Sequence, residues 1–115
     1  MTYLEVSEIV KSIELPYAYY QFPEGTGQAP PFVCFFYSST DDVFADNSNY
    51  QRIVTLNIEL YTAEKDFDLE AKVEKILAEK NLTYYKEENY IDSEKMWQIA
   101  YEMEVVINEQ GQIWS

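Results

Sequence analysis

The chain has 115 residues, with 21 Asp or Glu against 8 Lys or Arg, which gives a formal net charge of −13. This length suits one domain, and an apolar content of 47% excludes a disordered tail. The negative charge disfavours direct binding to nucleic acid and to anionic lipid. Without His and with a single Cys, the chain lacks the residues for His-dependent nucleophilic catalysis, the usual zinc sites and an intramolecular disulfide. We therefore expect no enzyme, no cofactor and no catalytic or metal-binding residues.

The first part of the chain predicts a helix and an aromatic strand. Apolar side chains recur at helical spacing over residues 3–13, and Pro16 ends that segment. Residues 17–22 are rich in aromatic side chains, which is typical of a strand. Residues 23–30 contain several Gly and Pro and predict a loop.

The middle of the chain predicts two strands around a loop. Residues 32–37 are apolar at every position, which indicates a strand covered on both faces, by a helix on one side and by another subunit on the other. The polar and acidic residues 38–49 predict a long loop. Residues 50–62 alternate between apolar and polar side chains, so we expect a strand with one dry face and one wet face.

The last part predicts a helix and two strands. Residues 66–80 have a second apolar stripe at helical spacing, with Asp66 as the N-cap. Residues 83–88 predict a short edge strand and residues 89–94 a turn. Residues 96–107 alternate and predict the last strand, and we expect residues 108–115 to form a flexible tail.

The expected order is therefore α-β-β-β-α-β-β in one domain over residues 1–115. Both helices are amphipathic, and the two strongest strands each have one dry face. The arrangement that buries all these faces is an α+β fold, a two-layer α/β sandwich. In it, both helices pack on one face of a mainly antiparallel sheet.

Acidic side chains form the first candidate functional surface. Some lie in the predicted loop, and others lie on the polar sides of two strands that we expect to share a sheet. One interpretation is a solvated face that keeps the protein soluble, and the other is a surface that repels a passing polyanion. The loop lacks the ligand spacing of a calcium-binding loop. The residues are Asp41, Asp42, Asp46, Glu59, Glu102 and Glu104.

Aromatic side chains form the second candidate surface. They make up 17% of the chain and cluster in two neighbouring predicted strands. Two helices cannot cover both faces of these strands, and aromatic residues are enriched at the centres of interfaces, so a subunit interface is one interpretation and core packing the other. A stacking platform for single-stranded nucleic acid needs a basic groove, whereas Arg52 is the only arginine. The candidate interface residues are Tyr17, Tyr19, Tyr20, Phe22, Phe35, Phe36 and Tyr37.

Several stretches of the chain together have a familiar pattern. They are LPYAYYQFPEGT (15–26), APPFVCFFY (29–37), NIELYTAEKD (57–66) with the helix that follows it, and IDSEKMW (91–97). This pattern resembles small virion proteins from the head–tail joining region of tailed phages and prophages of Gram-positive bacteria. The resemblance extends over about residues 1–107 and includes no catalytic motif.

The resemblance implies a tail terminator or head–tail joining protein, that is, a minor tail or minor capsid protein of the virion. Such proteins are α/β sandwiches that form a ring, typically a hexamer, on the end of the tail tube. The ring stops tube growth and offers a docking surface to head-connector proteins, and DNA passes through it without specific binding. The expected location is the virion, after synthesis in the cytoplasm of a bacterial host, with no membrane involved.

Under that interpretation the acidic residues line the channel and the aromatic residues form the subunit interface. Two alternatives stay open. One is another connector or adaptor component of the head–tail junction. The other, from a different class, is an acidic inhibitor that mimics DNA and occupies a nucleic-acid-binding protein.

Overall fold

The computed structural model describes residues 1–23, 25, 27–44 and 50–108, without the side chains of residues 41–44, 50 and 51. The described chain follows the predicted order α-β-β-β-α-β-β. The elements are α1 (Tyr3–Lys11), β1 (Tyr17–Tyr19), β2 (Phe32–Phe44), β3 (Tyr50–Thr62), α2 (Phe67–Glu79), β4 (Tyr85–Ile91) and β5 (Met96–Ile107).

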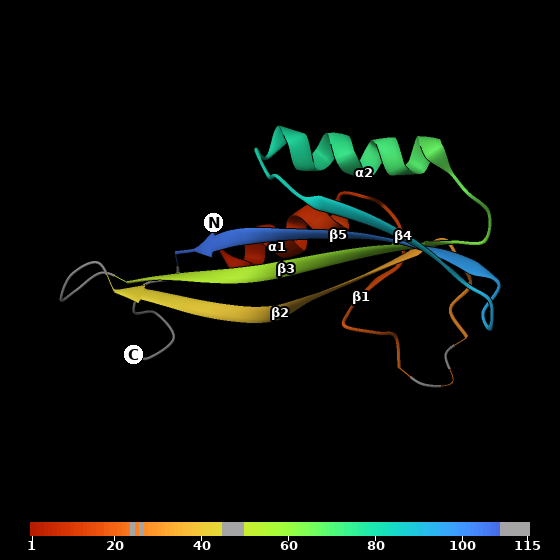
Figure 1. The fold of residues 1–115 in the computed structure, drawn as a ribbon, viewed down its shortest axis with the longest axis horizontal. Helices are drawn as coiled ribbons and strands as arrows, with labels where there is room; N and C mark the ends of the chain where they lie inside the picture. Colours follow the sequence, from red (N-terminus) through yellow and green to blue (C-terminus); the bar gives the residue numbers. More distant parts are fainter. Residues whose placement is uncertain (24, 26, 45–49, 109–115) are drawn as a thin grey trace.

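The described strands form one 5-stranded sheet in the order β1-β2-β3-β5-β4. β1 runs parallel to β2, and all other neighbours pair antiparallel. The long strands β2, β3 and β5 lie side by side and extend beyond the shorter strands at the edges (Figure 1). The predicted α+β sandwich with a mainly antiparallel sheet is therefore confirmed.

One hydrophobic core lies between the sheet and both helices. Its members come from α1, α2 and the helix-facing sides of β2, β3 and β5, so both helices cover the same face of the sheet. Tyr101 is the largest of the fully buried side chains. The inward positions of β5 alternate along the strand, as the period of two predicts; they are Ile99, Tyr101, Met103, Val105 and Ile107.

Capping interactions set the ends of the helices. The Thr2 hydroxyl accepts from the Glu5 amide at 3.1 Å, and the Glu5 carboxylate accepts from the Thr2 amide at 3.1 Å, which is a capping box. The Asp66 carboxylate accepts from the Leu69 amide at 3.0 Å, which confirms the predicted N-cap of α2. Asn81 follows α2 with φ 58°, a left-handed conformation that stops the helix.

The predicted loop at residues 38–49 is wrong over its first half. β2 continues to Phe44 and pairs with β3 down to the Phe44–Tyr50 pair, after a register shift between Tyr37 and Ser39. On this ladder the hydroxyls of Ser39 and Thr55 lie 2.7 Å apart and form a hydrogen bond between the two strands. Residues 45–49, including the candidate Asp46, lie outside the described residues.

The other boundaries differ by a few residues. β1 ends at Tyr19, because Tyr20 has φ 69° and turns the chain out of the strand. β4 continues through residues 89–91, which were predicted as a turn. The predicted tail begins at Asn108, whose amide donates to the Met1 carbonyl at 2.8 Å, and residues 109–115 lie outside the described part. No helix among the described residues is long and apolar enough to span a membrane.

Candidate functional site

The face of the sheet opposite the helices, which we call the open face, has the candidate acidic residues of the strands. Residues directly opposite each other in antiparallel strands share a face, so the register defines rows across the sheet. One row contains Phe32, Tyr61, Gln98 and Asn89, and the next contains Cys34, Glu59, Ala100 and Glu87. The rows after these are Phe36, Asn57, Glu102 and Tyr85, and then Ser39, Thr55 and Glu104.

The predicted residues Glu59, Glu102 and Glu104 therefore lie on one face, and the structure adds Glu87 from β4. Glu87, Glu102 and Glu104 are exposed, and Glu59 is half-buried. These rows contain no Lys or Arg. Among the ion pairs of the described residues, none involves any of these glutamates. The open face is thus acidic and not neutralised within the described chain.

The carboxylates on this face do not oppose each other across paired strands. Glu104 pairs with Thr55, Glu102 pairs with Asn57, and Glu59 pairs with Ala100. Like charges directly opposite each other on neighbouring strands destabilise a sheet. This spacing lets the open face accumulate negative charge at a low cost in stability.

Asp41 and Asp42 lie on β2 instead of in a loop. The register places Asp41 opposite Ile53 and Asp42 opposite Arg52, so the two aspartates alternate between the faces of the sheet. Their side chains are outside the described part of the chain. The predicted acidic group therefore does not form a single loop surface.

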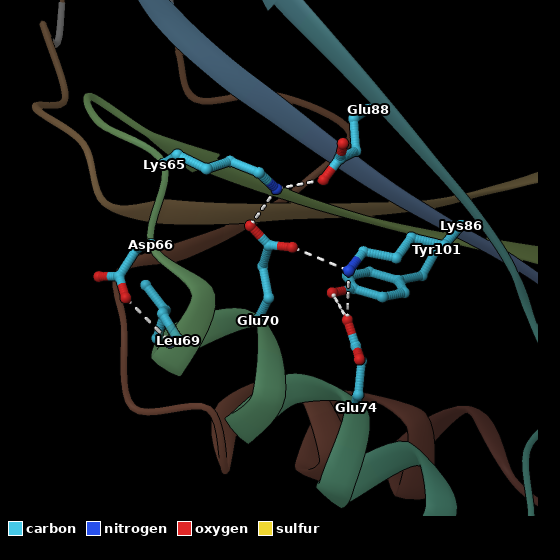
Figure 2. A network of polar contacts seen from close by, with 8 residues as sticks. All are labelled: Lys65, Asp66, Leu69, Glu70, Glu74, Lys86, Glu88 and Tyr101. Atoms are coloured by element: carbon cyan, nitrogen blue, oxygen red, sulfur yellow. Dashed lines mark hydrogen bonds and ion pairs between the residues drawn. The ribbon is translucent and has the colours of Figure 1, made fainter.

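On the helix side of the sheet, by contrast, two lysines form ion pairs with three carboxylates (Figure 2). Glu70 of α2 is 2% exposed and lies between two lysines. Lys65 Nζ is 2.5 Å from Glu70 Oε2, and Lys86 Nζ is 2.8 Å from Glu70 Oε1. Lys65 also pairs with Glu88 of β4, so this network ties α2 to β4.

The network continues along α2 to the core. Lys86 Nζ lies 2.7 Å from Glu74 Oε2, and the Tyr101 hydroxyl donates to the same oxygen at 2.8 Å. Burial raises the pKa of Tyr101 most, and the hydrogen bond to the Glu74 carboxylate raises this pKa further. Burial alone would raise the pKa of Glu70, but hydrogen bonds from Lys65 and Lys86 outweigh it and lower that pKa. Each lysine of this network pairs with two carboxylates and together they join α2 to β4, which is the arrangement of a structural clamp.

The candidate aromatic residues are divided by the sheet into two groups. On the helix side, the Tyr19 ring lies 5.3 Å from Phe35 and 6.0 Å from Tyr37. Phe35 is 6% exposed and belongs to the core, so the core reading is correct for that residue and its assignment to an interface is wrong. Tyr17 and Tyr19 on the edge strand β1 are exposed, as is Tyr20 beside it.

The second aromatic group lies on the open face. The Tyr20 ring contacts Phe36 at 5.6 Å, and the Phe22 ring contacts Phe32 at 5.3 Å. Phe32 stacks on Tyr61 at 4.8 Å. The open face of β2 is thus covered in part by the chain's own Tyr20 and Phe22, where the sequence predicted another subunit.

A groove of about 580 Å³ opens on this face between the chain after β1 and the β4–β5 turn. Cys34, Glu59 and Tyr61 are among its lining residues, together with Phe22 and Glu94. The Tyr61 hydroxyl donates to Glu59 at 2.9 Å and accepts from Gln98 at 2.9 Å. The pKa of the Cys34 thiol is raised to about 11, mainly by burial and in smaller part by the negative charge of Glu59.

Glu87, Phe32 and Tyr61 were not among the candidate site residues predicted from the sequence. Glu87 lies between Lys86 and Glu88, which hides the period of two, and only the register reveals its face. Tyr61 follows the predicted alternation of β3, which could have placed it on the wet face. Within the described part of the chain, no three His, Cys, Asp or Glu side chains gather in a way that could hold a metal ion.

Comparison with models of protein families and with curated proteins gives no match to this chain.

Proposed function

We propose that the protein is a virion component at the head–tail junction of a tailed phage or prophage. In this proposal it acts as a tail terminator, whose copies form a hexameric ring that caps the tail tube and lets DNA pass. The observation that carries the proposal is the open face, on which Glu59, Glu87, Glu102 and Glu104 have no cationic neighbour in their rows. The resemblance of residues 1–107 to head–tail joining proteins supplies the biological setting.

An acidic channel wall suits DNA that must move without stopping. Duplex DNA binds proteins mainly when Lys and Arg neutralise its phosphates and release counterions. A wall of carboxylates makes no such contact and repels the phosphates, so the DNA keeps its hydration and slides. The sheet supports this role mechanically, because Glu102 and Glu104 lie on β5, which is paired with β3 on one side and β4 on the other.

Assembly into a ring needs a surface that other copies can contact. The exposed edge of the sheet at β1 offers Tyr17, Tyr19 and Tyr20, which are 41%, 54% and 61% exposed. Tyrosine supplies a large contact area at low cost in side-chain entropy, and it is enriched in interface cores. In this proposal the β1 edge is one half of the subunit interface, and other surfaces contact the tail tube and the head connector.

The acidic open face also favours a second candidate, an inhibitor that mimics DNA. Such a protein would present its carboxylates to a basic groove of a nucleic-acid-binding protein, and salt would weaken that complex. A ring held by aromatic contacts tolerates salt. The two candidates therefore differ in their self-association.

Size-exclusion chromatography with light scattering, at low and high salt, tests the proposal. The terminator reading predicts a particle whose mass is a multiple of the 13.6 kDa subunit and that persists at high salt. A single-subunit mass at every concentration, together with salt-sensitive binding to a DNA-binding protein, would favour the mimic.

A further inference from the structure

We infer that the groove on the open face binds a cationic side chain, arginine or lysine, of a partner protein. This inference concerns one end of the open face and does not depend on the proposed function, because it follows from the chemistry of the groove alone.

Aromatic rings give the groove a rigid apolar wall. Tyr20 rests on Phe36, and Phe22 contacts Phe32, which stacks on Tyr61. The centroids of these ring pairs lie 4.8–5.6 Å apart, so the rings pack against one another. Aromatic rings attract cations through their electron-rich faces, and a guanidinium also stacks on them.

Carboxylates give the groove its charge. Glu59 is half-buried beside these rings, and its described hydrogen-bond partner is the Tyr61 hydroxyl. No described Lys or Arg forms an ion pair with it, which contrasts with Glu70 on the helix side. Glu94 adds a second carboxylate, and the described lining residues include no Lys or Arg. A partly buried carboxylate without a cation is a favourable site for one.

These features select one ligand chemistry. An anionic group would be repelled by Glu59 and Glu94. A purely apolar side chain would bury the Glu59 carboxylate without compensating its charge, which costs free energy. Arginine and lysine combine an apolar stem for the rings with a charge for the carboxylates. The volume of about 580 Å³ leaves room for the flanking residues of a peptide.

The test is a titration of ¹⁵N-labelled protein with the peptide acetyl-Gly-Arg-Gly-amide, followed by amide chemical shifts. The matched probe replaces arginine with citrulline, which has the same shape without the charge. We expect saturable shifts at Cys34 and Tyr61 with the arginine peptide and about tenfold weaker binding of the citrulline peptide.

Two variants distinguish binding in the groove from attraction by the overall negative charge of the open face. Glu59→Gln keeps the shape and an acceptor for Tyr61, and it should weaken binding of the arginine peptide about tenfold. Glu104→Gln removes an equal charge on the same face outside the groove and should leave binding unchanged. The amide spectra themselves report whether each variant is folded. The inference is overturned by the absence of saturable shifts, by equal affinity for both peptides, or by equal effects of the two variants.

Discussion

Lys86 Nζ of β4 lies 2.8 Å from Oε1 of Glu70, a carboxylate of α2 that is 2% exposed. Lys65 and Glu74 extend this pair into the clamp described above. Both lysines of the clamp lie on the helix side of the sheet. The carboxylates of the open face have no such partners among the described residues. The clamp on the helix side thus holds carboxylates in ion pairs that support the fold. The described carboxylates of the open face lie outside these pairs and are available for function.

Replacing Glu70 should test the structural half of this division. We expect Glu70→Gln to lower the free energy of unfolding by about 2 kcal/mol, because Lys65 and Lys86 lose the carboxylate between them and are partly able to regain water. Urea denaturation measures this loss. The control Glu79→Gln makes the same change at an exposed position of α2 and should have almost no effect. Equal stability of both variants would show that the network is dispensable.

The Glu70 carboxylate should make the free energy of unfolding depend on pH. The folded-state pKa of Glu70 lies below its ordinary value of 4.5, so its contribution is complete above that value and is lost as the pH falls through the folded-state pKa. The difference in unfolding free energy between the natural chain and Glu70→Gln should therefore shrink in acid. Denaturation curves between neutral and acidic pH measure it, and a constant difference would contradict the assignment.

Cys34 should be inert in the folded protein. It is 4% exposed, and burial raises its pKa to about 11, so at pH near 8 the thiol is neutral and shielded. A chromogenic disulfide reagent should label it slowly in buffer and rapidly in denaturant. Rapid stoichiometric labelling of the folded protein would show that the cover formed by the chain after β1 opens easily.

The sequence predicted the elements with a clear period. The apolar stripes predicted both helices, and Asp66 predicted where α2 begins. The alternation of apolar and polar side chains predicted β3 and β5. The extension of β2 through residues 38–44 was missed because its composition is typical of a loop, and only pairing with β3 satisfies its backbone. Such pairing is non-local and cannot be read from composition.

The faces of the aromatic strand were harder to assign. Phe35 and Phe36 are neighbours of the same residue type, yet Phe35 packs in the core and Phe36 lies on the open face. A strand that is apolar on both sides does not reveal which side meets the helices. The acidic face was predictable in part, because Glu59, Glu102 and Glu104 follow the period of two in strands that were correctly assigned.

Reversing charge on the open face should create binding to DNA. We expect the natural chain not to bind duplex DNA, and the double variant Glu102→Lys with Glu104→Lys to bind it with a slope of about −2 in log affinity against log salt, for two new phosphate contacts. Fluorescence anisotropy at several salt concentrations measures the slope.

A variant with the same net charge provides the control for that experiment. Glu64→Lys with Glu79→Lys changes exposed residues of the β3–α2 connection and of α2, outside the rows of the open face, and should bind DNA more weakly. If both double variants bind DNA equally, net charge alone explains the result and the open face has no special role.

The exposed edge at β1 should matter for assembly and little for folding. Tyr17 is 41% exposed, so Tyr17→Asp should leave the thermal unfolding temperature nearly unchanged while it prevents formation of the ring. Tyr17→Phe keeps the ring and the apolar area and should assemble normally. Light scattering of both variants distinguishes them, and normal assembly of Tyr17→Asp would remove β1 from the interface.

Deletion of the coding sequence from the phage or prophage that encodes the chain tests the central claim most directly. Electron microscopy of the resulting particles is the measurement. The account predicts tail tubes of uncontrolled length that are not joined to heads, with normal assembly restored when the protein is supplied from a plasmid. Particles with tails of normal length attached to heads would contradict it.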